Sequence, residues 1–368
     1  MAIVGQLRLK PVIAAIVTLF SISCQQAPVL PEAEKAKEIE SRLWRAGASS
    51  FAAEEYNSFY QALRTVRIHE LKERARLPLW RRLKRVQEEY QRVIEDGIKL
   101  LALVEERKQS QAKDLRNELS ELEGLITKLR AISSAINESR HIRQRITRAE
   151  VLIEEAKRNI EKVEFSGAKK AMAAAREPAL SARRIVLSLF ERYLDESYLR
   201  RWEKWVAETI AESRAKNNLA IIVDKLEKKL VVYSQGEKIE TYDVGLGRFG
   251  LADKLHAGDE ATPEGKYKVV KKNPNSRYYK ALLLDYPNED DRRRFQEMKK
   301  RGLIPPRIGI GGLIEIHGGG QDGLTYGCVA MEDEAIDELY EMAEVGTPVT
   351  IVGTVNRDSI ILNWVREL

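Results

Sequence analysis

Cysteine and histidine are scarce in this chain of 368 residues, which has two cysteines and four histidines. Neither Cys24 nor Cys328 has a partner at the spacing of a zinc site, so the sequence predicts no metal site. The two thiols lie in unrelated contexts, and we expect no disulfide between them. Residues 309–312 are glycine-rich but lack the Lys-Ser/Thr ending of a phosphate-binding loop. The sequence therefore predicts no cofactor.

Glycine and proline are also scarce from residue 34 to residue 216, where Glu, Lys, Arg, Ala and Leu dominate. Apolar residues recur there at intervals of three and four, which is typical of amphipathic helices. The apolar series changes phase around residues 137–139, which predicts an antiparallel helical hairpin with a coiled-coil-like seam. Residues 34–216 are thus expected to form an all-α bundle or coiled-coil region. Other breaks are expected at Gly47, Pro78 and Gly167, with a kink or restart at Pro178.

The last expected helix, at about 195–216, carries Trp202 and Trp205. We expect these tryptophans to pack within their own helical bundle, the alternative being contact with the C-terminal domain. A helical region of this kind could hold the rest of the chain away from a membrane, bind a partner, or dimerise. A heptad seam does not choose among these roles and leaves the oligomeric state open.

The hydrophobic period changes after residue 217, where short apolar runs separated by turn residues replace the helical pattern. Such runs predict strands. Residues 289–301 and 333–345 keep a helical composition, so the pattern alone indicates a β-rich domain with inserted helices. The expected strands are residues 219–223, 229–233, 239–244, 267–270, 313–316 and 349–352.

Residues 1–24 have the features of a secretion signal, with two basic residues before an apolar run at 12–20. That run is too short to span a bilayer as a mature helix. A small residue precedes Cys24, as in lipoprotein processing, although Ser21 stands where leucine is usual. We expect Cys24 to be lipidated and residues 25–33 to form a tether. Ordinary signal cleavage and a retained N-terminal anchor are the alternatives.

The residue after Cys24 is Gln25. By similarity to lipoprotein sorting in double-membraned bacteria, the lack of aspartate there favours the periplasmic face of the outer membrane. The net charge of +6 is uneven, because residues 1–216 carry +10 and residues 217–368 carry −4. A basic helical half could favour anionic lipid heads or wall polymers, or be a solvated mixed surface. An exported protein is a poor nucleic-acid binder, and we expect no such partner.

Cys328 and His317 lie eleven residues apart in a glycine-rich stretch. A thiol attacks a carbonyl as thiolate and therefore needs a neighbouring base. His317 can be that base if the intervening loop folds back, which its glycines make sterically easy. Cys328 alone would be better interpreted as a buried structural thiol. The pair together indicates nucleophilic catalysis.

Four ordered motifs extend this pattern. Residues 314–318 read Ile-Glu-Ile-His-Gly, and residues 325–331 read Thr-Tyr-Gly-Cys-Val-Ala-Met. Residues 258–267 contain Gly-Asp and Thr-Pro-Glu-Gly-x-Tyr, and residues 284–288 read Leu-Asp-Tyr-Pro-Asn; Gly346 and Thr347 open a last strand. Together they resemble the L,D-transpeptidase (YkuD-type) catalytic domain, over residues 217–354. The resemblance implies a β-sandwich of mixed sheets with a few helices, hence a multidomain α + β chain with a C-terminal extension at 355–368.

The resemblance also implies roles for single residues. Cys328 is the expected nucleophile and His317 the general base, with the imidazole oriented through the main-chain carbonyl of Gly318. The N–H groups of Tyr326, Gly327 and Cys328 are the expected oxyanion donors. Thr325 is expected to brace the turn. The expected substrates are peptidoglycan stem peptides.

Two departures from the family pattern concern the acyl acceptor. Many members carry basic residues where Tyr326 and Ala330 stand here, and the second of these, an arginine, can meet a substrate carboxylate. The spacing from His317 to Cys328 is also shorter than the commonest one. Both features resemble a branch typified by a murein amidase, which detaches outer-membrane lipoprotein from peptidoglycan. Whether amine or water is the acceptor stays open.

Four further side chains are expected near the substrate. Glu315 and His317 alternate onto one strand face, so Glu315 could tune the histidine or pair with Arg307 or Lys254. The tyrosines could line a substrate groove, or pack a lid. These four are Tyr278, Tyr279, Tyr286 and Glu315.

The favoured hypothesis is a lipid-anchored L,D-transpeptidase that transfers an acyl group through a thioester on Cys328, with a stem peptide or an envelope lipoprotein as acceptor. A hydrolase of the same family, an L,D-carboxypeptidase or an amidase that releases wall-bound lipoprotein, is the first alternative. A non-catalytic envelope scaffold is the second, motivated by the size of the helical half and the missing basic residues.

Overall fold

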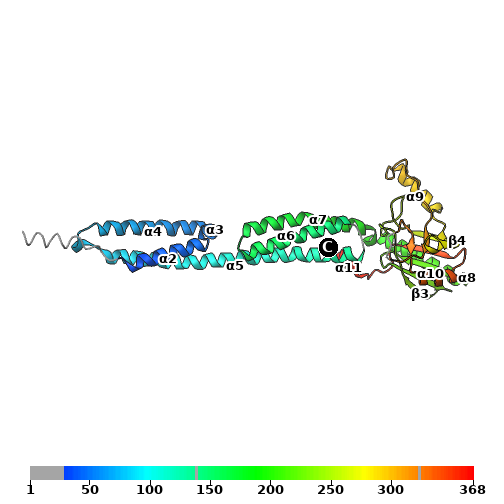
Figure 1. The fold of residues 1–368 in the computed structure, drawn as a ribbon, viewed down its shortest axis with the longest axis horizontal. Coiled ribbons are helices and arrows are strands. Elements are labelled where there is room, and N and C mark those ends of the chain that lie inside the picture. Colours follow the sequence, from blue (N-terminus) through cyan, green and yellow to red (C-terminus); the bar gives the residue numbers. More distant parts are fainter. Residues whose placement is uncertain (1–28, 137–139, 322–324) are drawn as a thin grey trace, which may run out of the picture. The chain divides into compact units, whose positions relative to one another are not determined.

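The computed structural model describes residues 29–136, 140–321 and 325–368. The predicted signal peptide, Cys24 and the expected break at residues 137–139 lie outside the described residues. The chain divides into two compact units. The first contains the described residues up to Glu118 together with Asn159–Ser166, and the second contains Leu119–Arg158 and Gly167–Leu368. Figure 1 shows the helices of both units and the sheet of the second.

The first unit is helical and has its own apolar core, which includes Leu43, Leu63 and Tyr90. The break predicted at Gly47 is confirmed, because Gly47 has a φ of 74° between two helices. The first helix starts at Pro31, inside the expected tether, since proline is well accepted at a helix start. The elements of the first unit include α2 (Pro31–Arg45), α3 (Ala48–Phe51), α4 (Ala53–Arg74), the 3-10 turn Pro78–Trp80, and part of α5 (Leu83–Ala135).

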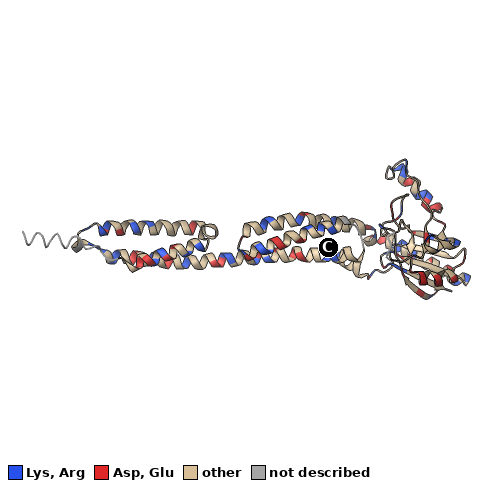
Figure 2. Cartoon of the chain, in the orientation of Figure 1, with Lys and Arg blue, Asp and Glu red and all other residues tan. Residues whose placement is uncertain are grey.

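The second unit begins with the remainder of α5 and α6 (Arg140–Glu161), which run antiparallel. Glu123 pairs with Lys157 at 2.6 Å, and Arg130 pairs with Glu150. Residue numbers therefore increase along α5 while those of their partners on α6 decrease. The predicted antiparallel hairpin is therefore confirmed. Both acidic and basic residues lie along these helices (Figure 2). Within the described residues, no helix combines the length and the apolar composition needed to cross a bilayer.

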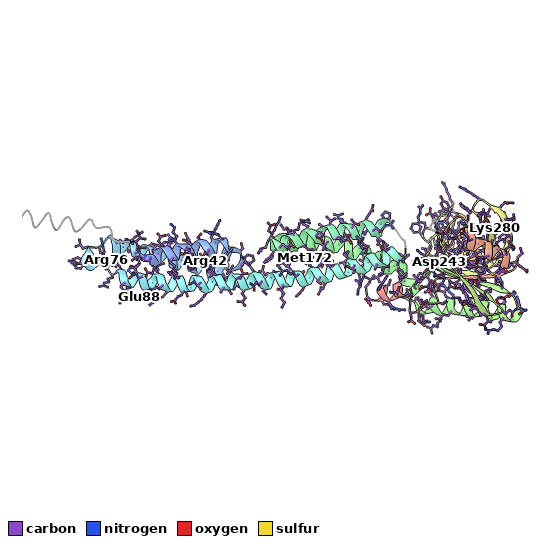
Figure 3. The ribbon with its side chains drawn as sticks, turned by 60° about the horizontal axis from the view of Figure 1, so that its bottom comes forward. Arg42, Arg76, Glu88, Met172, Asp243 and Lys280 are labelled. Atoms are coloured by element: carbon purple, nitrogen blue, oxygen red, sulfur yellow. The ribbon has the colours of Figure 1, made fainter. Side chains whose placement is uncertain are left out.

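The helix α7 (Phe165–Leu194) differs from expectation at two residues. The break predicted at Gly167 is wrong, because the chain turns at Val163, whose φ is 61°, and Gly167 lies inside α7. The helix also continues through Pro178 without restarting. Proline removes a hydrogen bond, but the helix keeps a buried face that includes Met172, labelled in Figure 3, and packing holds it in place.

The rest of the second unit is an eight-stranded mixed sheet with the strand order β3-β2-β1-β8-β4-β5-β6-β7. The pairs β1–β8 and β6–β7 are parallel, and the others are antiparallel. The strands are β1 (Leu219–Asp224), β2 (Lys229–Ser234), β3 (Glu237–Asp243), β4 (Gly265–Ser276), β5 (Tyr279–Leu284), β6 (Glu315–His317), β7 (Val329–Ala330) and β8 (Pro348–Val352).

The long strand β4 joins the two halves of this sheet. Residues 265–268 pair with β8, whereas residues from Val269 onward pair with β5 across two register shifts. Such bulges bend a strand, so β4 turns from one half into the other. The helices α9 (Glu289–Lys300) and α10 (Asp333–Met342) confirm the two charged helical stretches, while α11 (Ile360–Arg366) lies in the stretch expected to be an extension.

The helix α8 (Glu196–Lys216) packs on this sheet. The hydroxyls of Thr209 and Thr350 are 2.7 Å apart, and both side chains are buried. Trp202 is fully buried, contacts the ring of Tyr193 at 5.3 Å and fills the space beside Gly353, where an added Cβ would lie 2.3 Å from the indole. The expectation that Trp202 packs within the bundle is therefore wrong, because its indole also packs against the chain directly after β8.

Candidate active site

The strands β6 and β7 bring His317 and Cys328 to one face of the sheet. Their parallel register places Ile316 opposite Val329 and His317 opposite Ala330. Residues that face each other across two strands point the same way, and alternate residues along a strand share a face. Cys328 directly precedes β7 and stands two residues before the partner of His317, so strand alternation continued by one residue puts its side chain on the face of that histidine. The parallel pairing of β6 with β7 brings the two segments side by side, as the sequence prediction requires.

The imidazole of His317 is buried and held on two sides. Its Nδ1–H donates to the carbonyl oxygen of Gly318 at 2.6 Å. The ring of Tyr278 stacks on it, with centroids 4.5 Å apart and planes inclined at 23°. With Nδ1 as the donor, the free lone pair is on Nε2. The histidine is thus fixed in the tautomer that can accept a proton at Nε2.

The Cys328 thiol is a hydrogen-bond donor in this structure. Its Sγ lies 3.5 Å from the carbonyl oxygen of Leu313, to which it can donate. Burial raises the pKa of the thiol, and although the backbone N–H of Glu315 lowers it, the pKa remains above its ordinary value. The free protein therefore holds a neutral thiol at neutral pH, and a base must remove its proton when it attacks.

The turn before Cys328 is braced by Thr325. Its hydroxyl donates to the carbonyl of Cys328 at 2.8 Å and accepts the N–H of Gly327 at 3.1 Å. The bracing expected of Thr325 is present. The prediction that the N–H of Gly327 is an oxyanion donor is wrong, because that N–H donates to the Thr325 hydroxyl. The N–H groups of Tyr326 and Cys328 remain the expected oxyanion donors.

A second chain segment packs against this turn from the far side. The backbone of Gly245 exchanges two 2.9 Å hydrogen bonds with Ala330, and the segment continues to Ala261. Gly327 has a φ of 131°, and a Cβ there would lie 2.6 Å from the carbonyl oxygen of Ala261. Only glycine fits a backbone approach this close in that conformation. The residues 245–261 therefore form a wall of the catalytic turn.

The four residues expected near the substrate separate in space. Tyr278 contacts His317, as described. Tyr279 is directed away, because its hydroxyl donates to Asp337 of α10 at 3.0 Å. Tyr286 is a core residue, 5% exposed and packed edge-on against the ring of Tyr267, so its expected place in a groove is wrong. A tyrosine beside a buried strand end serves packing more often than binding.

Glu315 keeps its expected face but not its expected partners. Lys254 pairs with Asp259 at 2.7 Å, and in the described part of the chain no ion pair joins Glu315 to Arg307. Its backbone N–H lowers the pKa of the Cys328 thiol, whereas the charge of its carboxylate raises that pKa. Strand alternation identified the face correctly but carries no information about which cation lies nearest.

Sequence reasoning missed the carboxylate that fixes the loop after His317. Asp333 at the start of α10 accepts the N–H of Gly319 at 2.7 Å. An added Cβ on Gly318 would lie 2.7 Å from the Asp333 carboxylate. Its position at the first residue of a helix after the Cys328 turn was the available signal, because acidic residues there often bind backbone N–H groups.

A buried ion network behind the site was also missed. Lys225 is fully buried, and its ammonium donates to Glu264 at 2.9 Å and to the carbonyls of Ala252 and Thr262 at 2.6 and 2.8 Å. Arg192 of α7 binds the same Glu264 with two nitrogens at 2.7 and 3.1 Å. The network ties α7 to the segment that forms the wall of the catalytic turn.

Burial and charge oppose each other in this network. Burial by itself raises the pKa of Glu264, but the charges of Lys225 and Arg192 outweigh it, and the pKa lies below its ordinary value. Burial lowers the pKa of Lys225, an effect that the Glu264 charge opposes. No signal in the sequence distinguished Lys225 from the charged residues around it. Within the described residues no group of three or more potential ligands could hold a metal ion.

These features define a thiol–imidazole site on a mixed sheet, and comparison with known proteins agrees. Residues 218–351 match the family model of the L,D-transpeptidase catalytic domain, YkuD. The protein YafK of Escherichia coli K12, which bears a provisional L,D-transpeptidase name, is 32% identical over 127 residues, covering 33% of this chain and 45% of YafK. YafK of strain O157:H7 gives the same values. This chain thus spans less than half the length of these curated relatives.

Solved structures with a related fold include L,D-transpeptidases from two bacteria. The protein from Xylanimonas cellulosilytica is 16% identical, with 37% of this chain and 60% of that chain covered and a TM-score of 0.25. The protein from Mycobacterium smegmatis is 19% identical, with coverage of 36% and 58% and a TM-score of 0.23. The similarity to L,D-transpeptidase catalytic domains of the YkuD family thus concerns residues 218–351.

Proposed function

We propose that the protein is a cysteine-dependent acyltransferase that acts on the stem peptides of peptidoglycan. The observation that supports the proposal is the parallel pairing of β6, which holds His317, with β7, which directly follows Cys328, together with the hydrogen bond from Nδ1 of the histidine to Gly318. The family match supports the class of reaction and of substrate.

In the proposed first half-reaction, Nε2 of His317 takes the thiol proton as Sγ of Cys328 attacks an amide carbonyl of the stem peptide. The N–H groups of Tyr326 and Cys328 would stabilise the oxyanion. When the carbon–nitrogen bond breaks, the leaving amine takes the proton from His317. The acyl group then remains on Cys328 as a thioester.

In the second half-reaction, an amine of another stem or of an envelope lipoprotein attacks the thioester carbonyl. His317 accepts the proton of the amine and returns it to the sulfur as the thioester breaks. The products are a new amide and the free thiol. Cys328 and His317 are thus in their starting protonation states, so that the cycle balances.

Hydrolysis of the same thioester is the second candidate. The observation that favours it is that Ala330 stands where many family members carry arginine, so this position has no positive charge. Ala330 is 1% exposed. Tyr326, the other departure, is 75% exposed. Without a guanidinium to bind an acceptor carboxylate, water would compete better for the thioester. The products would be trimmed stems or released lipoprotein.

Purified protein incubated with a disaccharide tetrapeptide tests the proposal. Cross-linked dimers indicate transfer, and tripeptide without dimers indicates hydrolysis. Both products should disappear with Cys328→Ala, and an intact-mass increase on Cys328 should mark the acyl-enzyme. Absence of product and of acyl-enzyme with folded wild-type protein would reject both candidates and support the scaffold hypothesis.

Export and lipidation complete the proposal. Cys24 would carry the lipid and place the protein at the periplasmic face of the outer membrane, as proposed from residues 1–25. Labelling cells with radioactive palmitate checks this placement. Label should appear on the wild type and be lost with Cys24→Ala, whereas label on both proteins, or on neither, would contradict lipidation at Cys24.

A further inference from the structure

A cavity lies between the four helices α6, α7, α8 and α9 and the segment Ala252–Leu255. Its volume is about 860 Å³, and neither His317 nor Cys328 lines it. Cavities of this size commonly hold small ligands. We refer to it as the arginine pocket because its walls carry five guanidinium groups, which belong to Arg145, Arg184, Arg192, Arg201 and Arg294.

Only two of these five guanidiniums are neutralised by carboxylates. Arg192 binds Glu264 at 2.7 Å, and Arg294 binds Asp253, which itself lines the pocket. Arginine stays charged at every physiological pH. The balance of the pocket therefore depends on the remaining three arginines.

Among the described residues, the other three form no ion pair with a carboxylate, although Arg201 is close enough to lower the pKa of Asp195. Arg145 donates to neutral oxygens, the Ser181 hydroxyl at 2.9 Å and the His141 carbonyl at 3.1 Å. Arg201 lies over the ring of Tyr198, 4.3 Å from its centroid. In the portion of the chain that the structure describes, Arg184 has neither a hydrogen-bond nor an ion-pair partner. Three guanidinium groups that form no ion pair among the described residues thus line one concave surface.

This arrangement attracts anions, although Arg184 and Arg201 are themselves exposed to solvent. The three charges come from α6, α7 and α8, and like charges lining a cleft focus a positive potential in it. Guanidinium groups match phosphate and carboxylate oxygens with paired hydrogen bonds. Ile185, Leu189 and Met298 add an apolar wall, which leaves room for a non-polar body.

We propose that the arginine pocket binds a small polyanion, a ligand with two or more phosphate or carboxylate groups, which Arg145, Arg184 and Arg201 hold together. The site is separate from the acyl-transfer chemistry and does not depend on the proposed reaction. Phosphate and carboxylate share the required oxyanion chemistry, and the test below distinguishes them.

Isothermal titration of the full chain at fixed ionic strength tests the pocket with two probes, inorganic pyrophosphate and tricarballylate. At least one probe should bind with a stoichiometry of one. The stronger probe identifies the class, pyrophosphate for a phosphate ligand and tricarballylate for a carboxylate ligand. Absence of binding by both probes up to about 10 mM, a concentration that corresponds to negligible affinity, would overturn the proposal.

Charge-removing variants locate the site. Arg184→Gln should weaken binding about tenfold, the effect of losing one charge-assisted hydrogen bond. Arg143→Gln is the matched control, because Arg143 lies on α6 and is exposed but does not line the pocket. Its binding should stay within about twofold of the wild type. Equal weakening by both variants would show general charge attraction and would overturn the proposal.

A loss of anion binding in Arg184→Gln would not be due to misfolding. Arg184 is exposed and its guanidinium has no partner in the described part of the chain, so Arg184→Gln should unfold at the wild-type temperature. Arg145→Gln gives a second measurement from another helix and should also weaken binding. Loss of binding in Arg184→Gln with unchanged binding in Arg145→Gln would mean that the anion does not lie between them, and would overturn the shared site.

Discussion

The ring of Tyr278 stacks on the imidazole of His317, with centroids 4.5 Å apart and an angle of 23° between the planes. Together with the 2.6 Å hydrogen bond from Nδ1 to Gly318, it restricts the histidine to one plane. A general base must be oriented before its lone pair can meet the thiol proton. Tyr278 therefore positions the base, although it lies on the connection between β4 and β5.

Replacing Tyr278 separates the ring from its hydroxyl. Tyr278→Ala should reduce kcat about 10- to 100-fold, because a misdirected base lowers the rate of proton transfer. Tyr278→Phe keeps the stacked ring and should keep kcat within about threefold. Steady-state kinetics on a tetrapeptide substrate measures both. Equal losses in the two variants would show that the hydroxyl, and not the stacked ring, is needed.

The protonation state of Cys328 predicts how its reactivity changes with pH. Because the pKa of the thiol is raised by burial, the thiolate fraction should be small at neutral pH and increase only above the pH of an ordinary cysteine. Iodoacetamide alkylation of Cys328, followed by peptide mass spectrometry, should therefore show a rate that rises with pH. An inflection near or below pH 7 would instead indicate a resting thiolate–imidazolium pair.

Gly327 allows a steric prediction. Its φ of 131° and the 2.6 Å distance from an added Cβ to the Ala261 carbonyl predict that Gly327→Ala displaces the catalytic turn. Activity should fall at least about 100-fold. Gly124→Ala is the control, since Gly124 lies inside α5 with nothing within 4 Å of an added Cβ. That variant should be about 1 kcal/mol more stable, measured by denaturant unfolding.

The buried ion network predicts a large difference between two glutamates. Glu264→Ala leaves Lys225 buried without its carboxylate and should cost about 3–5 kcal/mol of unfolding free energy. Glu208→Ala removes an exposed pair with Lys266, of similar 2.9 Å length, and should cost less than about 1 kcal/mol. Denaturant unfolding compares them. Similar costs would mean that water reaches the Lys225 ammonium.

Much of the fold follows from local pattern. The hairpin of α5 and α6 was predictable because its apolar seam repeats over many turns, and the edges of β1 and β2 were predictable because apolar runs end at polar turns. The two-residue strand β7 was not, since so short a strand forms only through its pairing with β6. Sequence period carries no information about such partners.

The site divides in the same way. His317 and Cys328 stand out because histidine and cysteine are rare in this chain, and Gly318 was identified through the family motif that contains His317. Tyr278 and Tyr286 looked alike in sequence, yet one contacts the imidazole and the other fills the core. The difference arises from the register of β5 against β6, a long-range pairing.

The hydroxyl of Thr209 on α8 lies 2.7 Å from that of Thr350 on β8, although α8 lies outside residues 218–351, the part that matches the catalytic family. The segment that matches the family model is therefore shorter than the segment that packs around this sheet, which includes α8. A fragment excised at residue 218 would expose a large apolar surface that α8 normally shields. In this protein, α8 covers one side of the sheet with its buried residues and belongs to the same compact unit as the matched residues.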